Sequence, residues 1–378
     1  MTVPLTKPDF GVAEEQAVAE VLRLGWVVQG PKVAQFEAAI AAYAEAKHAV
    51  ATSSCTTALQ LILTALRVGP GDEVIVPAFT FIASANAVEY VGATPVFVDV
   101  DPRTYNLEVR GIEERITART KAIMPVHLFG LAADMEPILA LARKSGLAVV
   151  EDAACATGTR YRGKRVGALG TAGAFSYHPR KVITTGEGGA VMTNDGALAE
   201  HVRVLRNHGA RRSDLEQHKA DAFTLPEYDE LGFNYRMTDL QAALGVVQMA
   251  KADRLIGDRR TLAERYTNAL AGVPGLDTPF VPDGCEHAYQ SYVLRIEGGA
   301  KTRDEVAVAL TKDGISVRHG THAVHALGYY RRKYDLKESD FPESWRADRS
   351  SLTLPLYSTM DHATQDRVID ALHKLLRS

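Results

Sequence analysis

Short apolar runs alternate with helical patterns in the first part of the chain, and this alternation limits the fold more than any other feature. The apolar runs cover residues 49–52, 73–77, 94–99, 122–127 and 147–151. The segments with apolar side chains at helical spacing cover residues 33–47, 58–66, 81–90 and 135–144. This alternation predicts an α/β fold in which a mostly parallel sheet is sandwiched by helices. Binding sites in such folds lie beyond the carboxyl ends of the strands.

The later part of the chain has a different pattern. Residues 211–230 are charged, have few apolar anchors and are expected to form an exposed loop. A long helix is expected over 237–255, with a continuation through Tyr266 left open, and three further elements are predicted at 289–296 (strand), 303–312 (helix) and 363–375 (helix). We therefore expect a large domain over residues 1–254, including the N-terminal segment, and a smaller α+β domain over residues 255–378.

Charge and cysteine content narrow the range of partners. The formal net charge of -3 gives no electrostatic reason to expect binding to nucleic acid or an anionic membrane. No apolar run is long enough to cross a bilayer, and the first residues lack the order of a signal peptide. Cys55, Cys155 and Cys285 are spaced neither as metal ligands nor as a disulfide framework. We expect a cytoplasmic protein without a metal, a nucleic-acid partner or a membrane partner.

A lysine and an aspartate indicate the chemistry. Lys181 ends the sequence Ser-Tyr-His-Pro-Arg-Lys and precedes a glycine-rich turn, and Asp152 follows the apolar run 147–151. A pyridoxal phosphate enzyme requires this pair, because the lysine forms a Schiff base with the cofactor and the aspartate keeps its ring nitrogen protonated. Taken singly, the lysine is more simply a solvated charge, and the aspartate is more simply a helix cap.

Other segments fit a phosphate group and an aromatic ring. The turn at 53–57, which includes Thr56 and Thr57, opens a helix and offers hydroxyl and backbone N–H groups to a phosphate. The hydroxyl of Ser176 lies five residues before Lys181, within reach of the same phosphate. Phe81 is suited to stacking on the cofactor ring, although composition alone favours a place in the core.

Several motifs, in order along the whole chain, resemble the DegT/StrS-type sugar aminotransferases. These enzymes belong to the aspartate aminotransferase fold type (type I) of pyridoxal phosphate enzymes. The motifs lie at residues 28–32, 53–59, 69–81, 95–101, 151–154, 176–181, 186–189 and 232–239. The resemblance implies a transaminase of the same fold, with a smaller C-terminal domain.

The resemblance also implies a role for each matching residue. Lys181 would form the Schiff base and carry the proton between substrate and cofactor, which requires a pKa well below its usual value of about 10.4. Asp152 would pair with the ring nitrogen and Phe81 would stack on the ring. The phosphate would be held by Thr56, Thr57 and Ser176. Asn234 matches a residue that reaches the cofactor phosphate of the neighbouring subunit, which implies a homodimer with shared active sites.

Two positions depart from the pattern of the family. Relatives often have glutamine or histidine where this chain has Cys155, near the ring hydroxyl of the cofactor, and a thiol is a poor hydrogen-bond donor. Many relatives have glycine at the position of Cys55. A histidine in place of Lys181 would mark the dehydrase branch of the family, so the lysine favours transamination.

The substrates are less defined by the sequence. The resemblance implies L-glutamate as the amino donor and a nucleotide-linked keto-sugar, a 4-keto or 3-keto 6-deoxyhexose, as the acceptor. A keto-cyclitol acceptor and a non-catalytic pyridoxal phosphate-binding protein are the alternatives. His322 and His325 are candidates for binding the sugar or its diphosphate. Zinc is disfavoured at His319, His322 and His325 because Gly320 interrupts any helix there.

Overall fold

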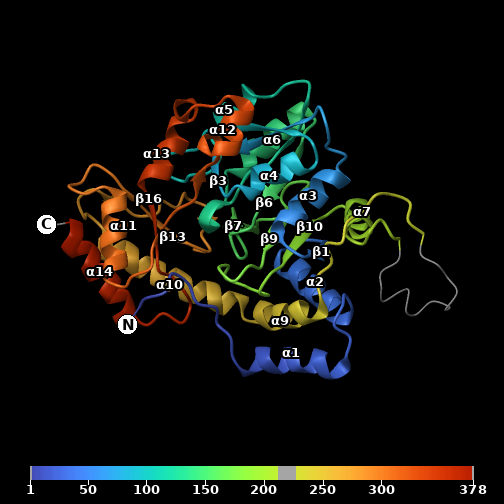
Figure 1. Ribbon diagram of the computed structural model, residues 1–378, viewed down its shortest axis with the longest axis horizontal. Coiled ribbons are helices and arrows are strands. Elements are labelled where there is room, and N and C mark those ends of the chain that lie inside the picture. The colour runs from blue at the N-terminus through green and yellow to red at the C-terminus, as the bar shows by residue number, and fades with distance from the viewer. Residues whose placement is uncertain (1, 212–226, 377–378) are drawn as a thin grey trace.

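A seven-stranded sheet forms the centre of the larger part of the protein (Figure 1). The computed structural model describes residues 2–211 and 227–376. In spatial order the strands are β1 (His48–Thr52), β10 (Gly189–Thr193), β9 (Ala172–Ser176), β6 (Ala148–Asp152), β5 (Thr120–Ile123), β2 (Glu73–Pro77) and β4 (Thr94–Val98). Within this sheet β10 runs opposite to the other six strands, so the mostly parallel sheet is confirmed.

Both faces of this sheet are covered, which explains why its strands are continuously apolar. In β2, Val74 and Val76 face one helical layer and Ile75 faces the other. The first layer consists of α3 (Cys55–Ala65), α4 (Ala83–Tyr90) and α7 (Gly196–Arg206). The second consists of α2 (Pro31–Tyr43), α5 (Val109–Glu113), α6 (Met135–Ser145) and α9 (Asp239–Ala250). The helix α1 (Val12–Leu24) packs on α9 at the bottom of Figure 1.

A smaller antiparallel sheet lies in the C-terminal part, at the left of Figure 1. Its strands, in spatial order, are β11 (Leu276–Asp277), β13 (Tyr292–Ile296), β16 (Ser351–Leu354) and β14 (Arg318–His319). The helices that share its core are α10 (Ala252–Leu270), α11 (Arg303–Lys312) and α14 (His362–Leu376). The division after residue 254 stays a prediction.

One C-terminal segment packs on the large sheet instead. The strand β15 (His322–Ala323) pairs with β3 (Phe79–Thr80), and Tyr330 of α12 (Gly328–Tyr334) packs on Phe97 of β4. The strands β3 and β15 form a two-stranded sheet of their own, and the helix α13 (Pro342–Ser350) contacts both of them as well as β13 and β14 of the smaller antiparallel sheet. The remaining strands, β7 (Arg160–Tyr161), β8 (Lys164–Arg165) and β12 (Cys285–Glu286), form a small separate sheet.

Some predicted boundaries were wrong. The single helix expected over 237–255 is two helices, α9 and α10, which meet at Lys251. The helix expected from residue 81 begins at Ala83, because Phe79 and Thr80 are drawn into the ladder with β15. Most of the loop expected at 211–230 lies outside the described residues. Within the described ranges, no helix has the length and apolarity needed to cross a membrane.

Candidate active site

Lys181 and Asp152 lie at the carboxyl edge of the large sheet, as parallel-sheet topology predicts. Asp152 is the last residue of β6, and Lys181 follows the neighbouring strand β9 by five residues. The Nζ atom of Lys181 lies 3.1 Å from the Sγ atom of Cys155. The structure therefore brings together the two principal predicted residues and places the unusual Cys155 beside the lysine amine.

The carboxylate of Asp152 is nearly buried, with 5% of the residue exposed. Its Oδ2 atom accepts a 2.6 Å hydrogen bond from Ser84 Oγ, and its Oδ1 atom accepts a 3.1 Å bond from the Ala154 backbone N–H. An ionised carboxylate has about four acceptor positions. Two bonds from described residues leave capacity for the N–H of a cofactor ring.

A buried histidine–glutamate pair supports the strand that carries Asp152. Glu151 points to the opposite face of β6 and accepts hydrogen bonds from the backbone N–H groups of Gly167 and Gly170, both at 2.7 Å. His127 Nδ1 accepts from the Ala133 N–H, so its Nε2 carries the proton and donates to Glu151 at 2.9 Å. The end of β6 is therefore fixed from both faces.

The predicted phosphate residues gather at the start of α3. Ser54 caps this helix by accepting from the Thr57 N–H, and the Thr57 hydroxyl donates to the Ser54 carbonyl at 2.8 Å. Ser176 pairs with Gly189 in the sheet, and a Cβ atom at Gly189 would lie 2.3 Å from the Ser54 carbonyl carbon. Glycine is therefore required for β10 to approach the N-terminus of α3, where backbone N–H groups favour an anion.

Phe81 is not a core residue. It lies just beyond β3 and is 56% exposed, with its ring centroid 6.5 Å from that of His322. His325 is placed differently: it is fully buried, packs edge-on against Phe341, and its Nε2 lies 3.4 Å from the Glu338 carbonyl oxygen. The structure thus pairs Phe81 with one predicted substrate residue and places the other within the protein interior.

The pKa of Lys181 is raised above its usual value of 10.5. Burial alone lowers it, as expected from the sequence, but the interaction and hydrogen bond with Cys155 and the smaller electrostatic effects of Cys55 and Asp152 favour the ammonium form and together outweigh burial. Burial and the charge of Asp152 also raise the pKa of the Cys55 thiol. In the cofactor-free chain the pKa of this lysine is therefore raised, and a cationic group bound beside it would act in the opposite direction.

These residues fit pyridoxal phosphate. Asp152 has acceptor capacity for the ring nitrogen, Lys181 has a primary amine beside it, Phe81 has an exposed ring, and α3 begins with hydroxyl and backbone N–H groups suited to an anion. In the described part of the chain no three histidine, cysteine or acidic side chains are grouped as metal ligands. The arrangement is compatible with the four contacts expected from the sequence.

The sequence patterns did not indicate Ser84 or the pair of His127 and Glu151. Ser84 lies three residues after Phe81, and only the spacing of Thr80 and Ser84 on one side of a helical turn could have indicated it. Of the remaining predicted residues, Asn234 is exposed and its neighbour Tyr235 accepts a hydrogen bond from the Ser53 N–H through its carbonyl oxygen. This loop therefore lies beside the start of α3.

Comparisons with known proteins agree with this geometry. Residues 8–373 match the sequence model described as the DegT/DnrJ/EryC1/StrS aminotransferase family. The GDP-perosamine synthase of Caulobacter vibrioides is 42% identical over 377 residues, covering 99% of this chain and 98% of that protein. DesV of S. venezuelae, solved with a ketimine intermediate, superposes with a TM-score of 0.90 at 37% identity and 99% and 98% coverage.

A third protein is the putative sugar aminotransferase Spr1654 from Streptococcus pneumoniae. Its PLP form superposes with a TM-score of 0.92 at 28% identity, with 99% and 98% coverage. These matches confirm the fold type expected from the sequence and the expectation of a pyridoxal phosphate-dependent transaminase.

Proposed function

Because the chain belongs to the DegT/DnrJ/EryC1/StrS aminotransferase family, we propose that it moves the amino group of L-glutamate onto a nucleotide-linked keto-sugar. The acceptor in this proposal is a 4-keto or 3-keto 6-deoxyhexose, and the product is an amino sugar. The observation that carries the proposal is the meeting of the Lys181 amine, the Asp152 carboxylate and the start of α3 at one edge of the sheet. The name of the Caulobacter relative, which specifies a GDP-linked product, supports a nucleotide-linked acceptor.

Each residue has a defined task in this proposal. Bound pyridoxal phosphate supplies a ring that accepts electrons from the reacting carbon. Asp152 accepts the N–H of the ring nitrogen, while Thr56, Thr57 and Ser176 hold the phosphate at the positive end of α3. Phe81 covers the ring face and excludes water from it.

Lys181 is the group that moves protons. Its amine can take a proton from the substrate carbon only when it is neutral, and a cationic ring nearby lowers its pKa in the required direction. Cys155, at 3.1 Å, holds the amine at one position between proton transfers. His322, beside Phe81, is placed to bind the acceptor.

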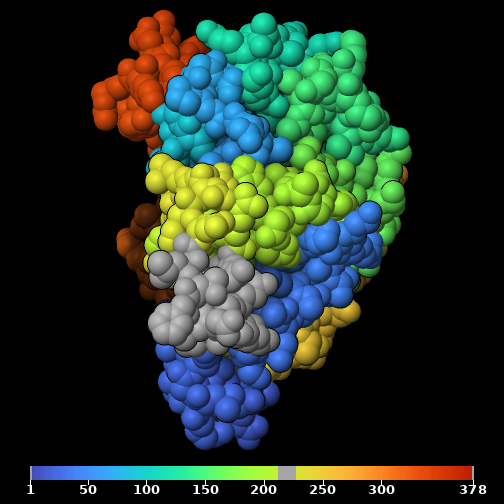
Figure 2. Space-filling model, turned by 90° about the vertical axis from the view of Figure 1, so that its right-hand side faces the viewer, coloured from blue at the N-terminus to red at the C-terminus, as the bar shows by residue number. Residues whose placement is uncertain are grey.

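We extend the proposal to a homodimer with shared sites. Asn234 is exposed beside the start of α3, and its segment carries Leu231, which is 87% exposed. Figure 2 shows the segment after residue 227 (yellow) on the molecular surface. In a dimer Asn234 would reach the cofactor phosphate of the partner. Light scattering tests this assembly, and a monomeric mass at enzyme-assay concentrations would contradict it.

We also propose that the protein is cytoplasmic. The three free cysteines of the chain favour a reducing compartment, and cell fractionation would test this location.

The decisive experiment follows the first half of the reaction. Pyridoxal phosphate is added to the purified protein, then L-glutamate, and both the visible absorption and the 2-oxoglutarate formed are measured. We expect stoichiometric 2-oxoglutarate from the wild type and none from Lys181→Ala. Lys144→Ala, at an exposed lysine of α6, is the control and should match the wild type.

Three results would contradict parts of the proposal. Absence of the shifted absorption band that a Schiff base between the lysine and the cofactor produces would refute the role of Lys181. Absorption that glutamate does not change would refute the amino donor. If glutamate reacts, a panel of nucleotide-linked keto-sugars and keto-cyclitols identifies the acceptor, and turnover of cyclitols alone would overturn the sugar assignment.

A further inference from the structure

Ser84 links two of the elements that carry the predicted cofactor residues. It lies in the first turn of α4, three residues after Phe81, and is fully buried. Its Oγ atom is 2.6 Å from Asp152 Oδ2 and 3.0 Å from Thr80 Oγ1. A single hydroxyl therefore joins β3 and α4 to the end of β6.

The direction of these bonds follows from the number of protons available. A hydroxyl has one proton to donate, and an ionised carboxylate can only accept. The Ser84 proton therefore goes to Asp152, and Thr80 donates its own proton to Ser84. The carbonyl oxygen of Phe81, 3.3 Å from Ser84 Oγ, competes for the same proton at a longer distance. The result is a chain of two hydroxyls that both donate toward Asp152.

Because both hydroxyl groups are buried, the hydrogen bonds between Thr80, Ser84 and Asp152 are strong, and water cannot replace them. Thr80 is 1% exposed and Ser84 is 0% exposed, so solvent water has no access to either hydroxyl. Hydrogen bonds to an ionised acceptor are stronger than neutral ones, and bonds in series polarise one another. Ser84 fixes Oδ2 of Asp152 while the Ala154 N–H fixes Oδ1, so together they set the plane of the carboxylate.

We propose that Ser84, supported by Thr80, is a positioning residue that orients the Asp152 carboxylate toward the ring nitrogen of bound pyridoxal phosphate. This inference rests on the proposed role of Asp152. The hydroxyl chain stabilises the ionised carboxylate, and an ionised carboxylate retains the proton on the ring nitrogen. Ser84 itself touches neither substrate nor cofactor in this scheme.

The test uses Ser84→Ala and two readouts that do not depend on turnover. The first is the dissociation constant of pyridoxal phosphate, measured by titrating the cofactor-free protein. The second is the pH at which the ring nitrogen loses its proton, measured from the 15N chemical shift of ring-labelled cofactor. A hydrogen bond to a charged group is worth about 10- to 100-fold in an equilibrium constant, and this sets the upper limit for the loss of cofactor affinity, because the bond from Ser84 to Asp152 lies within the protein. We expect a weakening of up to that size, together with proton loss from the ring nitrogen at a lower pH.

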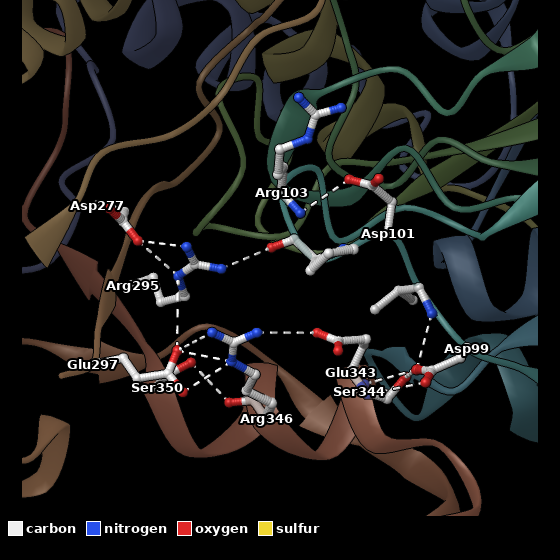
Figure 3. Close-up of polar contacts among 12 residues, drawn as sticks. Asp99, Asp101, Arg103, Asp277, Arg295, Glu297, Glu343, Ser344, Arg346 and Ser350 are labelled. Atoms are coloured by element: carbon white, nitrogen blue, oxygen red, sulfur yellow. Dashed lines mark hydrogen bonds and ion pairs between the residues drawn. The ribbon is translucent and has the colours of Figure 1, made fainter.

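Matched variants separate positioning from general stability. Ser84→Thr keeps the hydroxyl and should restore both readouts, while Thr80→Val removes only the outer hydroxyl and should change both less. Ser344 is the control serine, because it is also fully buried and its Oγ lies 2.6 Å from Asp99 Oδ1 (Figure 3). Ser344→Ala should lower the melting temperature but leave both cofactor readouts at wild-type values.

The outcomes distinguish the inference about Ser84 from the proposed role of Asp152, on which it rests. If folded Ser84→Ala binds the cofactor within twofold of the wild type and its ring nitrogen titrates unchanged, while Asp152→Asn alters both, only the Ser84 inference fails. If Asp152→Asn also alters neither, the role of Asp152 itself fails. If Ser84→Ala does not fold, Thr80→Val decides the question, and unchanged readouts in that variant overturn the inference.

Discussion

Asp152 and Asp99 occupy equivalent places in the fold but have different surroundings. Each lies at the carboxyl end of a parallel strand, and each accepts a 2.6 Å hydrogen bond from a fully buried serine. Asp99 accepts four hydrogen bonds, from the backbone N–H groups of Val100, Glu343 and Ser344 and from the Ser344 hydroxyl. Asp152 accepts two from described residues.

This difference separates a structural carboxylate from a candidate functional one. About four acceptor positions are available on a carboxylate, so Asp99 is saturated and holds the first turn of α13 against the large sheet (Figure 3). Asp152 is held by the same kind of bond but keeps acceptor capacity, and it lies near the Lys181 amine. An aspartate at the end of a strand can bind a ligand only if the protein leaves some of the acceptor positions of its carboxylate unused.

Neutralising Asp152 should have the largest effect on activity. In Asp152→Asn the ring nitrogen loses its anionic partner, and removal of one such electrostatic contact lowers kcat by about 100- to 1000-fold. Steady-state kinetics with a saturating amino donor measures this loss. Asp99→Asn is the matched variant, and we expect it to lose about 1 to 2 kcal/mol of stability through the weakened helix cap, with kcat close to the wild-type value. Equal losses of kcat in both variants would abolish the distinction between the two sites.

The sequence contains both aspartates in the same context, after short apolar runs, and pattern alone does not separate them. The parallel sheet, its order of strands and helices, and the edge at which the site lies could be predicted from the spacing of apolar residues. The hydrogen bonds of the two aspartates could not be predicted in this way, because Ser84 and Asp152 are 68 residues apart in the sequence and Ser344 and Asp99 are 245 residues apart. Only the folded chain shows which carboxylate is saturated. The separation of α9 from α10 was missed for a related reason, since both helices continue one apolar pattern.

The protonation of Lys181 offers a second way to compare the sites. Against burial, which lowers it, Cys155 and, to a smaller extent, Asp152 contribute to the raised pKa of this lysine in the cofactor-free protein. A negative charge favours the ammonium form, so neutralising Asp152 should lower the pKa and let the amine react at lower pH. We expect Lys181 to be acylated faster at pH 9 in Asp152→Asn than in the wild type, measured by mass spectrometry of its peptide. Asp99→Asn should react at the wild-type rate, and acceleration in that variant would mean that the effect is not local.

The smallest effect is expected at the exposed ion pairs near Asp99. The Nε atom of Arg346, on α13, lies 2.9 and 2.8 Å from the two carboxylate oxygens of Glu297, and their side chains are 45% and 39% exposed (Figure 3). Solvent screening limits such a pair to about 0.5 kcal/mol, and added salt weakens it further. A double-mutant cycle of Arg346→Ala and Glu297→Gln, measured by urea unfolding at low and high salt, should give a coupling of this size that shrinks with salt.

Cofactor affinity should be unchanged in all three variants of that cycle, because this pair anchors α13 from its solvent side and adds nothing to the orientation of Asp152. A coupling above about 2 kcal/mol would place the pair among buried, structurally critical contacts. A change in cofactor affinity would mean that α13 transmits its position to the active site through β15 and β3. In that case Asp99 would also affect cofactor binding through α13, and the two aspartates would differ only in their distance from the cofactor.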